Sequence, residues 1–186
     1  SALVYGVGGM LNRFLNFLLL PLFTAYLSPE DYGLLSILFV VSFLATPVFS
    51  LGFSAAVAPC YFEPGDPDRR AHTLWTATTI LAVSAGAMVL LGLGFDAAIS
   101  LAALGTSEHG SLVVLTLLAA ACGIVAEPWG HALRFENRAR AFVVLSSLSS
   151  LITIGGSAVL VIGLGRGVRG MLEGGLIGQA ATLLLY

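Results

Sequence analysis

The sequence predicts an all-α fold, a polytopic membrane helix bundle with about six transmembrane helices. Hydrophobic residues make up 58% of the 186 residues and charged residues only 10%, whereas soluble domains are about half apolar and about a quarter charged. Mean hydropathy is +0.97. A chain with so few charged residues cannot form a surface that faces water on all sides. The apolar stretches are continuous and lack the alternation of a transmembrane β-barrel.

Six apolar stretches lie between charged and Pro/Gly-rich breaks, and a membrane helix needs about 20 such residues. We expect helices at residues 3–27, 35–60, 73–95, 112–133, 142–164 and 171–186. The last has about 16 residues, which at 1.5 Å per residue falls short of a full span. Because the chain also begins with serine, we expect it to be a piece of a longer protein, truncated at both ends.

The first stretch carries a polar stripe. Asn12, Arg13 and Asn16 share one helical face with Gly9. An arginine in the middle of a span costs from about 2.5 to above 10 kcal/mol, depending on the method of measurement. A water-filled cavity or an anionic partner removes that cost, and the planar guanidinium fork binds phosphate well. We therefore predict that these three polar residues line a substrate cavity.

The alternative is a structural ion pair between Arg13 and an acid of another helix, either Glu127 or Glu173. Both interpretations can hold if the acid keeps the arginine until an anionic ligand displaces it. Glu127 also shares a helical face with His131, so it is a candidate for ion or proton coupling. No third ligand accompanies this pair, and we expect no metal site.

The second stretch is introduced by SPED, residues 28–31. Ser28 can cap a helix, Pro29 suits its first position, and Asp31 completes a capping box. Farther along the chain, Pro47 and Pro128 fall inside apolar stretches, as Pro21 does in the first. Interior prolines bend helices and free carbonyl groups, which membranes tolerate where helices line cavities or move.

The turn GRGVRG, residues 165–170, fits the G-x-G-x-x-G fingerprint, but it joins two membrane helices instead of following a strand. We expect no dinucleotide and no other cofactor there. Gly170, Gly174 and Gly178 recur every four residues, which predicts close packing against a neighbouring helix. The histidines are scattered over different loops and helix ends, so a membrane-embedded transferase is disfavoured and we expect no enzyme.

The arginines near the helix ends predict the orientation. The loops on one side of the membrane hold five arginines: Arg69, Arg70, Arg134, Arg138 and Arg140. The loops on the other side hold two: Arg166 and Arg169. We expect the first group, and with it both ends of the chain, to be cytoplasmic. The net charge of −2 and the lack of a basic stripe exclude nucleic-acid partners.

Three segments carry a resemblance to a known family. They are YLSPEDYGLLS, in which a short turn opens the second helix, LRFENRARAFVVLSSLSSL, an arginine-bearing loop before a serine-rich helix, and GRGVRGMLEGGLIGQ, a glycine-rich turn before the last helix. Together with residues 11–63 they resemble the polysaccharide and O-antigen flippases of the multidrug/oligosaccharidyl-lipid/polysaccharide exporter superfamily. The resemblance covers essentially the whole chain.

This resemblance implies a two-lobe transporter of the bacterial inner membrane, with residues 1–186 as its N-terminal six-helix lobe and a C-terminal lobe as its partner. It implies alternating access, in which an undecaprenyl-pyrophosphate-linked oligosaccharide crosses from the inner to the outer leaflet for surface polysaccharide such as the O-antigen of lipopolysaccharide. Arg13 would meet the pyrophosphate, and Asn12 and Asn16 would orient it or contact sugar hydroxyls.

Two alternatives remain open at this point. One is an ion-coupled exporter of drugs or small molecules, which typically carries an acid in an early helix; here the first stretch has an arginine and no acid. The other is a non-transporting membrane scaffold subunit, which predicts that Arg13 is held in a tight internal pair with no cavity beside it.

Overall fold

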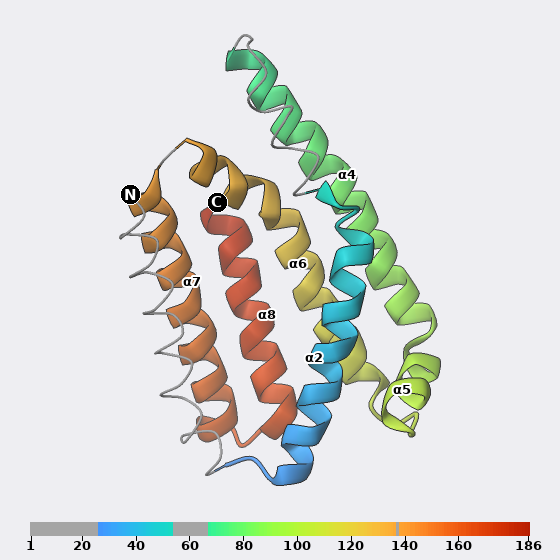
Figure 1. The fold of residues 1–186 in the computed structure, drawn as a ribbon. Coiled ribbons are helices and arrows are strands. Elements are labelled where there is room, and N and C mark those ends of the chain that lie inside the picture. Colours follow the sequence, from blue (N-terminus) through green and yellow to red (C-terminus); the bar gives the residue numbers. More distant parts are fainter. Residues whose placement is uncertain (1–25, 54–66, 137) are drawn as a thin grey trace.

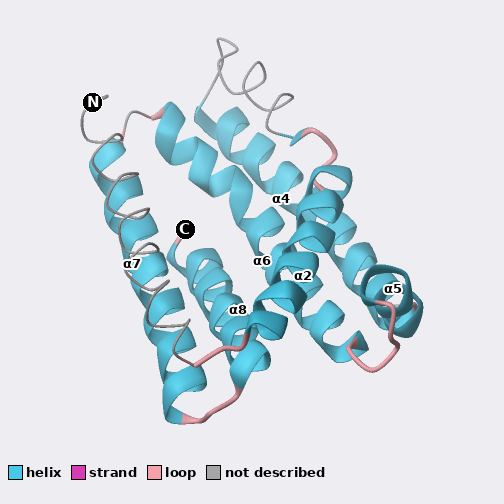
Figure 2. Cartoon of the chain, turned by 60° about the horizontal axis from the view of Figure 1, so that its bottom comes forward, coloured by secondary structure: helices cyan, strands magenta, loops and turns pink. Residues whose placement is uncertain are grey.

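The computed structural model describes residues 26–53, 67–136 and 138–186, and in these ranges all regular structure is helical (Figures 1 and 2). The elements are α2 (Pro29–Phe49), α4 (Pro67–Gly94), α5 (Asp96–Leu104), α6 (Gly110–Phe135), α7 (Ala139–Ala158), the π-helical turn η1 (Val159–Gly163) and α8 (Gly167–Leu185). This confirms the predicted all-α fold.

Four of the described helices are long and apolar enough to cross a membrane: Pro29–Phe49, Arg70–Gly94, Gly110–Phe135 and Arg140–Gly163. They correspond to the predicted stretches 35–60, 73–95, 112–133 and 142–164. The predicted helix at 3–27 lies outside the described residues except for its last two, Tyr26 and Leu27, and α8 corresponds to the stretch 171–186.

The largest differences from the sequence prediction are the bounds of α2, the start of α4 at Pro67 instead of residue 73, and the additional helix α5. Helix α2 begins at Pro29 and ends at Phe49, so it is shifted toward the N-terminus relative to the predicted 35–60. The reason is the capping box, which starts the helix ahead of the purely apolar residues. The Asp31 N–H donates to Ser28 Oγ at 3.2 Å, and the Ser28 N–H donates to Asp31 Oδ2 at 2.9 Å. The predicted capping box is therefore confirmed.

Helix α5 was not predicted, because its nine residues are too few for a span. It follows α4 directly, and it ends at Gly105, whose φ of 73° is left-handed and favours glycine. The Ser100 hydroxyl donates to the Thr106 carbonyl at 2.6 Å and closes the following turn.

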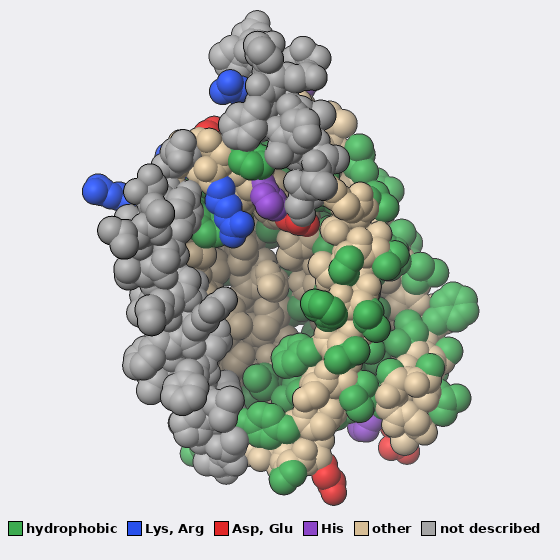
Figure 3. Space-filling model, in the orientation of Figure 1, with side chains coloured by type: hydrophobic (Ala, Val, Ile, Leu, Met, Phe, Trp, Pro, Cys, Tyr) green, Lys and Arg blue, Asp and Glu red, His purple; other side chains and the backbone are tan. Residues whose placement is uncertain are grey.

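Helix α6 is the centre of the bundle and packs against α2, α4, α5, α7 and α8. Helices α2, α6 and α8 run in one direction, whereas α4 and α7 run in the other (Figure 1). The core between them contains fully buried Leu38, Leu81, Met88 and Val113. Large apolar side chains also cover the outside, for example Phe43, which is 74% exposed (Figure 3). A surface of this kind suits lipid and not water.

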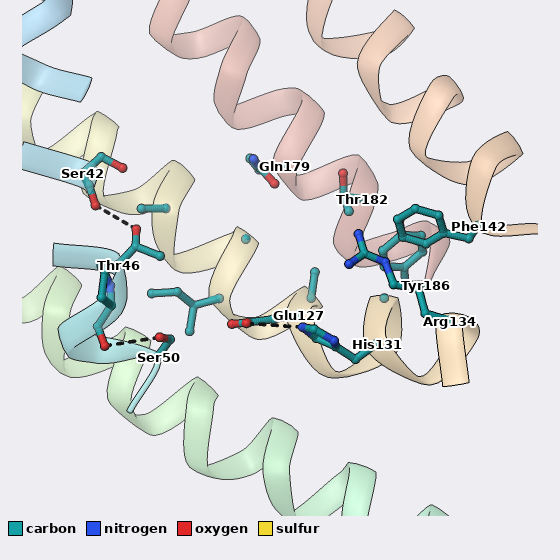
Figure 4. A pocket seen from close by; sticks show the side chains of 16 residues that line it. Ser42, Thr46, Ser50, Glu127, His131, Arg134, Phe142, Gln179, Thr182 and Tyr186 are labelled. Carbon is teal, nitrogen blue, oxygen red and sulfur yellow. Dashed lines mark hydrogen bonds and ion pairs between the residues drawn. The ribbon is translucent and has the colours of Figure 1, made fainter. Parts of the chain in front are cut away.

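Helix α8 lies unusually close to α7, as the glycine spacing predicted. A methyl group added at Gly174 would overlap Ser157, and one added at Gly178 would overlap Thr153. The glycine stripe is thus confirmed as a packing surface. Gln179 and Tyr186 lie on another face of α8 and meet α6, where methyl groups added at Gly123 and Gly130 would contact them, and both line a cavity (Figure 4).

Candidate functional site

A cavity of about 650 Å³ lies between α2, α6, α8 and the start of α7. Figure 3 shows this hollow, with cationic, acidic and histidine side chains at one end of it. Its polar lining comes from three helices and their ends: Ser42, Thr46, Ser50, Glu127, His131, Arg134, Gln179, Thr182 and Tyr186. Small residues such as Ala120, Gly123 and Gly130 leave the space open.

One face of α6 supplies the charged side of the cavity, since Glu127, His131 and Arg134 follow each other at spacings of four and three residues. Glu127 Oε1 lies 3.6 Å from His131 Nε2, and each side chain is 24% exposed. The contact becomes an ion pair when the imidazole is protonated. Pro128 lies inside this segment of the helix. Because proline has no N–H, the carbonyl of Ile124 lacks its usual helical hydrogen bond from residue 128. Ile124 is itself one of the residues that line the cavity.

Arg134 is oriented by an aromatic ring from the next helix. Its guanidinium carbon lies 4.3 Å from the centre of the Phe142 ring on α7. Figure 4 shows Arg134 beside Phe142 and Tyr186, with its guanidinium toward the cavity. A cation–π contact of this kind contributes about 0.5–2 kcal/mol. It orients the plane of the guanidinium without consuming its N–H donors, and in the described part of the chain Arg134 enters no ion pair.

The residues that the sequence singled out fall in three places. Asn12, Arg13 and Asn16 lie outside the described residues. Glu127 lines the cavity next to His131. Glu173 does not line it: it lies near the start of α8, where its carboxylate accepts from Arg166 Nη1 at 2.6 Å and from Arg169 Nε at 3.1 Å.

Sequence reasoning missed Arg134 and Gln179 as cavity residues. Arg134 was assigned to a loop and used only for orientation. It continues the Glu127–His131 face by three residues, and that spacing was a signal available in the sequence. Gln179 is an amide within the apolar run of α8, where a polar side chain is costly unless it is hydrogen-bonded, and that position in the run was the available signal.

The cavity holds no clear metal site: within the described ranges, no group of three or more His, Cys, Asp or Glu side chains converges. What the cavity offers is a fixed cation, a carboxylate–imidazole pair and neutral hydrogen-bonding groups. This combination suits an anionic, hydroxyl-rich head group.

Comparison with known families gives a match over almost the whole chain. A family model described as polysaccharide biosynthesis protein matches residues 1–185. The match includes residues 12, 13 and 16 and all the cavity residues except Tyr186. Comparisons with curated proteins and with solved structures found no match.

Proposed function

Because the chain belongs to the polysaccharide biosynthesis protein family, we propose that it is the N-terminal lobe of a flippase for undecaprenyl-pyrophosphate-linked oligosaccharides. It is a membrane protein with four described helices long enough to span a bilayer. The observation that carries the proposal is the polar cavity with Arg134 at one end, inside a bundle whose outer surface is apolar. The cavity would take the head group, while the polyprenyl tail stays in the lipid.

The lining matches the two parts of such a head group. A pyrophosphate needs donors with positive charge, and Arg134 with His131 can supply them. The sugars need neutral donors and acceptors, which the hydroxyls of α2 and the amide of α8 can supply. Arg13, with Asn12 and Asn16 beside it, is proposed to add a second cation from the first helix.

We propose that the end of the cavity that holds Arg134 faces the cytoplasm, and that the head group would enter there. The end of α6 and the start of α7 lie at this end of the bundle, and they carry Arg134, Arg138 and Arg140 (Figure 1). The opposite end has Arg166 and Arg169, which share the carboxylate of Glu173. This arginine bias supports the orientation. A C-terminal lobe would face the cavity, and rocking of the two lobes would give alternating access.

One feature supports an ion-coupled mechanism, either for this flippase or for an exporter of the same superfamily. Glu127 is the carboxylate of the described cavity lining, and it lies beside a group that can accept a proton. A membrane-depth acid of this kind is typical of proton or sodium coupling. The cation at the cavity end nevertheless favours an anionic lipid over a cationic drug.

The proposal is tested in cells that lack their own flippase, by expressing the full-length parent protein and measuring surface polysaccharide. The wild type is expected to restore export. Arg13→Ala is expected to reduce it about 10- to 100-fold at matched protein level, since a hydrogen bond to a charged group contributes about 1.5–3 kcal/mol. Arg13→Lys should restore part of the activity, because the charge remains and the fork is lost.

Two outcomes would count against these assignments. Failure of the well-expressed wild type to restore any polysaccharide would contradict the flippase function. Normal export by Arg13→Ala would leave the function standing but would remove the substrate-binding role of Arg13, and the structural ion pair would then be the better account of the polar stripe.

A further inference from the structure

The Gln179 side chain lies in the cavity and makes no hydrogen bond to the part of the chain that the structure describes. It extends from α8 toward α6 (Figure 4), where a Cβ added at Gly123 would lie 3.4 Å from its Oε1 atom. The amide offers two donors and one acceptor. No hydrogen bond links it to any other described residue, and the side chain is exposed to the cavity. An amide at this depth is costly unless water or a ligand satisfies it.

The neighbouring hydroxyls differ from this amide. The Thr46 hydroxyl donates to the Ser42 carbonyl at 2.8 Å, and the Thr182 hydroxyl donates to the Gly178 carbonyl at 2.9 Å. Both protons are therefore used inside their own helices, which leaves these groups as acceptors. Gln179 can both donate to a ligand hydroxyl and accept from it.

The packing of α8 fixes the position of this amide. Gly178, the residue before it, lies against Thr153 of α7, and Gly174 lies against Ser157 one turn earlier. These contacts hold the helix by its backbone, so the direction of the Gln179 side chain is set by a rigid element. Binding groups on rigid helices hold their geometry better than groups on loops.

The amide lies deeper in the bundle than the residue that carries the cation. Gly123, next to the amide, and Arg134 are both on α6, and eleven residues at 1.5 Å each place their backbones about 16 Å apart. A ligand whose phosphate is held at Arg134 would therefore reach Gln179 only with the part that extends deeper into the bundle. Glu127 lies between Gly123 and Arg134 on α6. Because its carboxylate would repel an anion, the part of the ligand that reaches Gln179 is expected to be neutral.

We infer that Gln179 is a specificity-determining residue that recognises the saccharide, by hydrogen bonds between its amide and the hydroxyl or acetamido groups of a neutral sugar. This inference rests on the proposed function. It separates the two parts of the head group: Arg134 contributes affinity for the pyrophosphate, and Gln179 contributes selectivity for lipids that carry a sugar.

The test measures binding of two lipids to the full-length protein in nanodiscs. One is polyprenyl pyrophosphate without sugar, and the other is the polyprenyl-pyrophosphate-linked oligosaccharide that accumulates in host cells without a flippase. Wild-type protein is expected to bind the sugar-bearing lipid more tightly. Gln179→Met, which keeps the shape and removes the amide, should weaken that binding about tenfold and leave binding of the bare lipid unchanged.

Binding of the bare lipid also reports that the variant is folded. Thr79→Val, on the lipid-facing side of α4, is the matched control and should change neither affinity. Equal weakening of both lipids by Gln179→Met, or no weakening of either, would overturn the inference, as would a wild type with no preference for the sugar-bearing lipid. A wild type that binds both lipids no better than phosphatidylglycerol would overturn the proposed function itself.

Discussion

Replacement of Arg134 by alanine is expected to reduce surface polysaccharide about 10- to 100-fold in flippase-deficient cells that express the full-length protein at wild-type level. The guanidinium lies at the end of the cavity, against the Phe142 ring at 4.3 Å, and in the described structure no carboxylate neutralises it. Its hydrogen bonds to a phosphate would each contribute about 1.5–3 kcal/mol. Their loss gives the expected decrease in export.

Arg138→Ala provides the matched control for this experiment. Arg138 carries the same charge and lies at the same end of the bundle, but it is 63% exposed, does not line the cavity, and its nearest acid is Glu136 at 3.7 Å. Exposed pairs of this kind contribute about 0–1 kcal/mol. Export by this variant should stay close to the wild type. Equal loss in both variants would mean that general positive charge matters, and not a phosphate contact at Arg134.

Arg134→Lys separates charge from geometry. Lysine keeps the positive charge but lacks the planar fork that binds phosphate in a bidentate way, and it stacks less well on an aromatic ring. We expect export between that of the alanine variant and that of the wild type. Full activity of the lysine variant would show that the planar fork and its stacking on Phe142 are not needed for function.

The fold could be predicted from the sequence because membrane helices are defined by the length of their apolar runs. The same criterion explains the errors. It placed the start of α2 at residue 35, since Glu30 and Asp31 interrupt the apolar run, although both belong to the first helical turn. It missed α5, which is apolar but short. The capping box at Ser28 was a better guide than hydropathy, because it reflects the backbone hydrogen bonds themselves.

The site could be predicted only in part, because spacing places residues on one helix face but does not bring two helices together. Glu127 and His131 were found this way. The position of Arg134 depends on Phe142 across the connection from α6 to α7, and that of Gln179 depends on how α8 packs against α7. Neither arrangement is encoded in the spacing of a single helix.

Substitution of Gly174 by alanine is expected to be among the most destabilising single changes in the described part of the chain. The added methyl group would overlap the backbone nitrogen and Cα of Ser157 as well as its hydroxyl. No side-chain rotation relieves a clash with backbone, so α7 and α8 must separate. We expect the free energy of unfolding to fall by about 3 kcal/mol, near the upper end for overpacked sites. Thermal unfolding of the full-length protein in detergent measures this.

Gly175→Ala is the control, because it makes the same chemical change one residue along the same helix. No atom of the described residues lies within 4 Å of a methyl group added there, and alanine has a higher helix propensity than glycine by about 1 kcal/mol. The unfolding temperature should therefore stay the same or rise slightly. If both variants were equally unstable, the glycines would matter for backbone freedom and not for the contact with α7.

Gly178→Ala tests the same packing with a different contact. Its added methyl group would first meet the hydroxyl of the Thr153 side chain. The double variant Gly178→Ala/Thr153→Ala lacks that hydroxyl and should therefore recover part of the lost stability. The corresponding change of Ser157 to alanine should not rescue Gly174→Ala, because the backbone of Ser157 remains in place. Such a difference between two double-mutant cycles would arise from the α7–α8 contact itself. Because this contact also sets the direction of Gln179, recovery of stability in the Gly178 cycle should be accompanied by recovery of export.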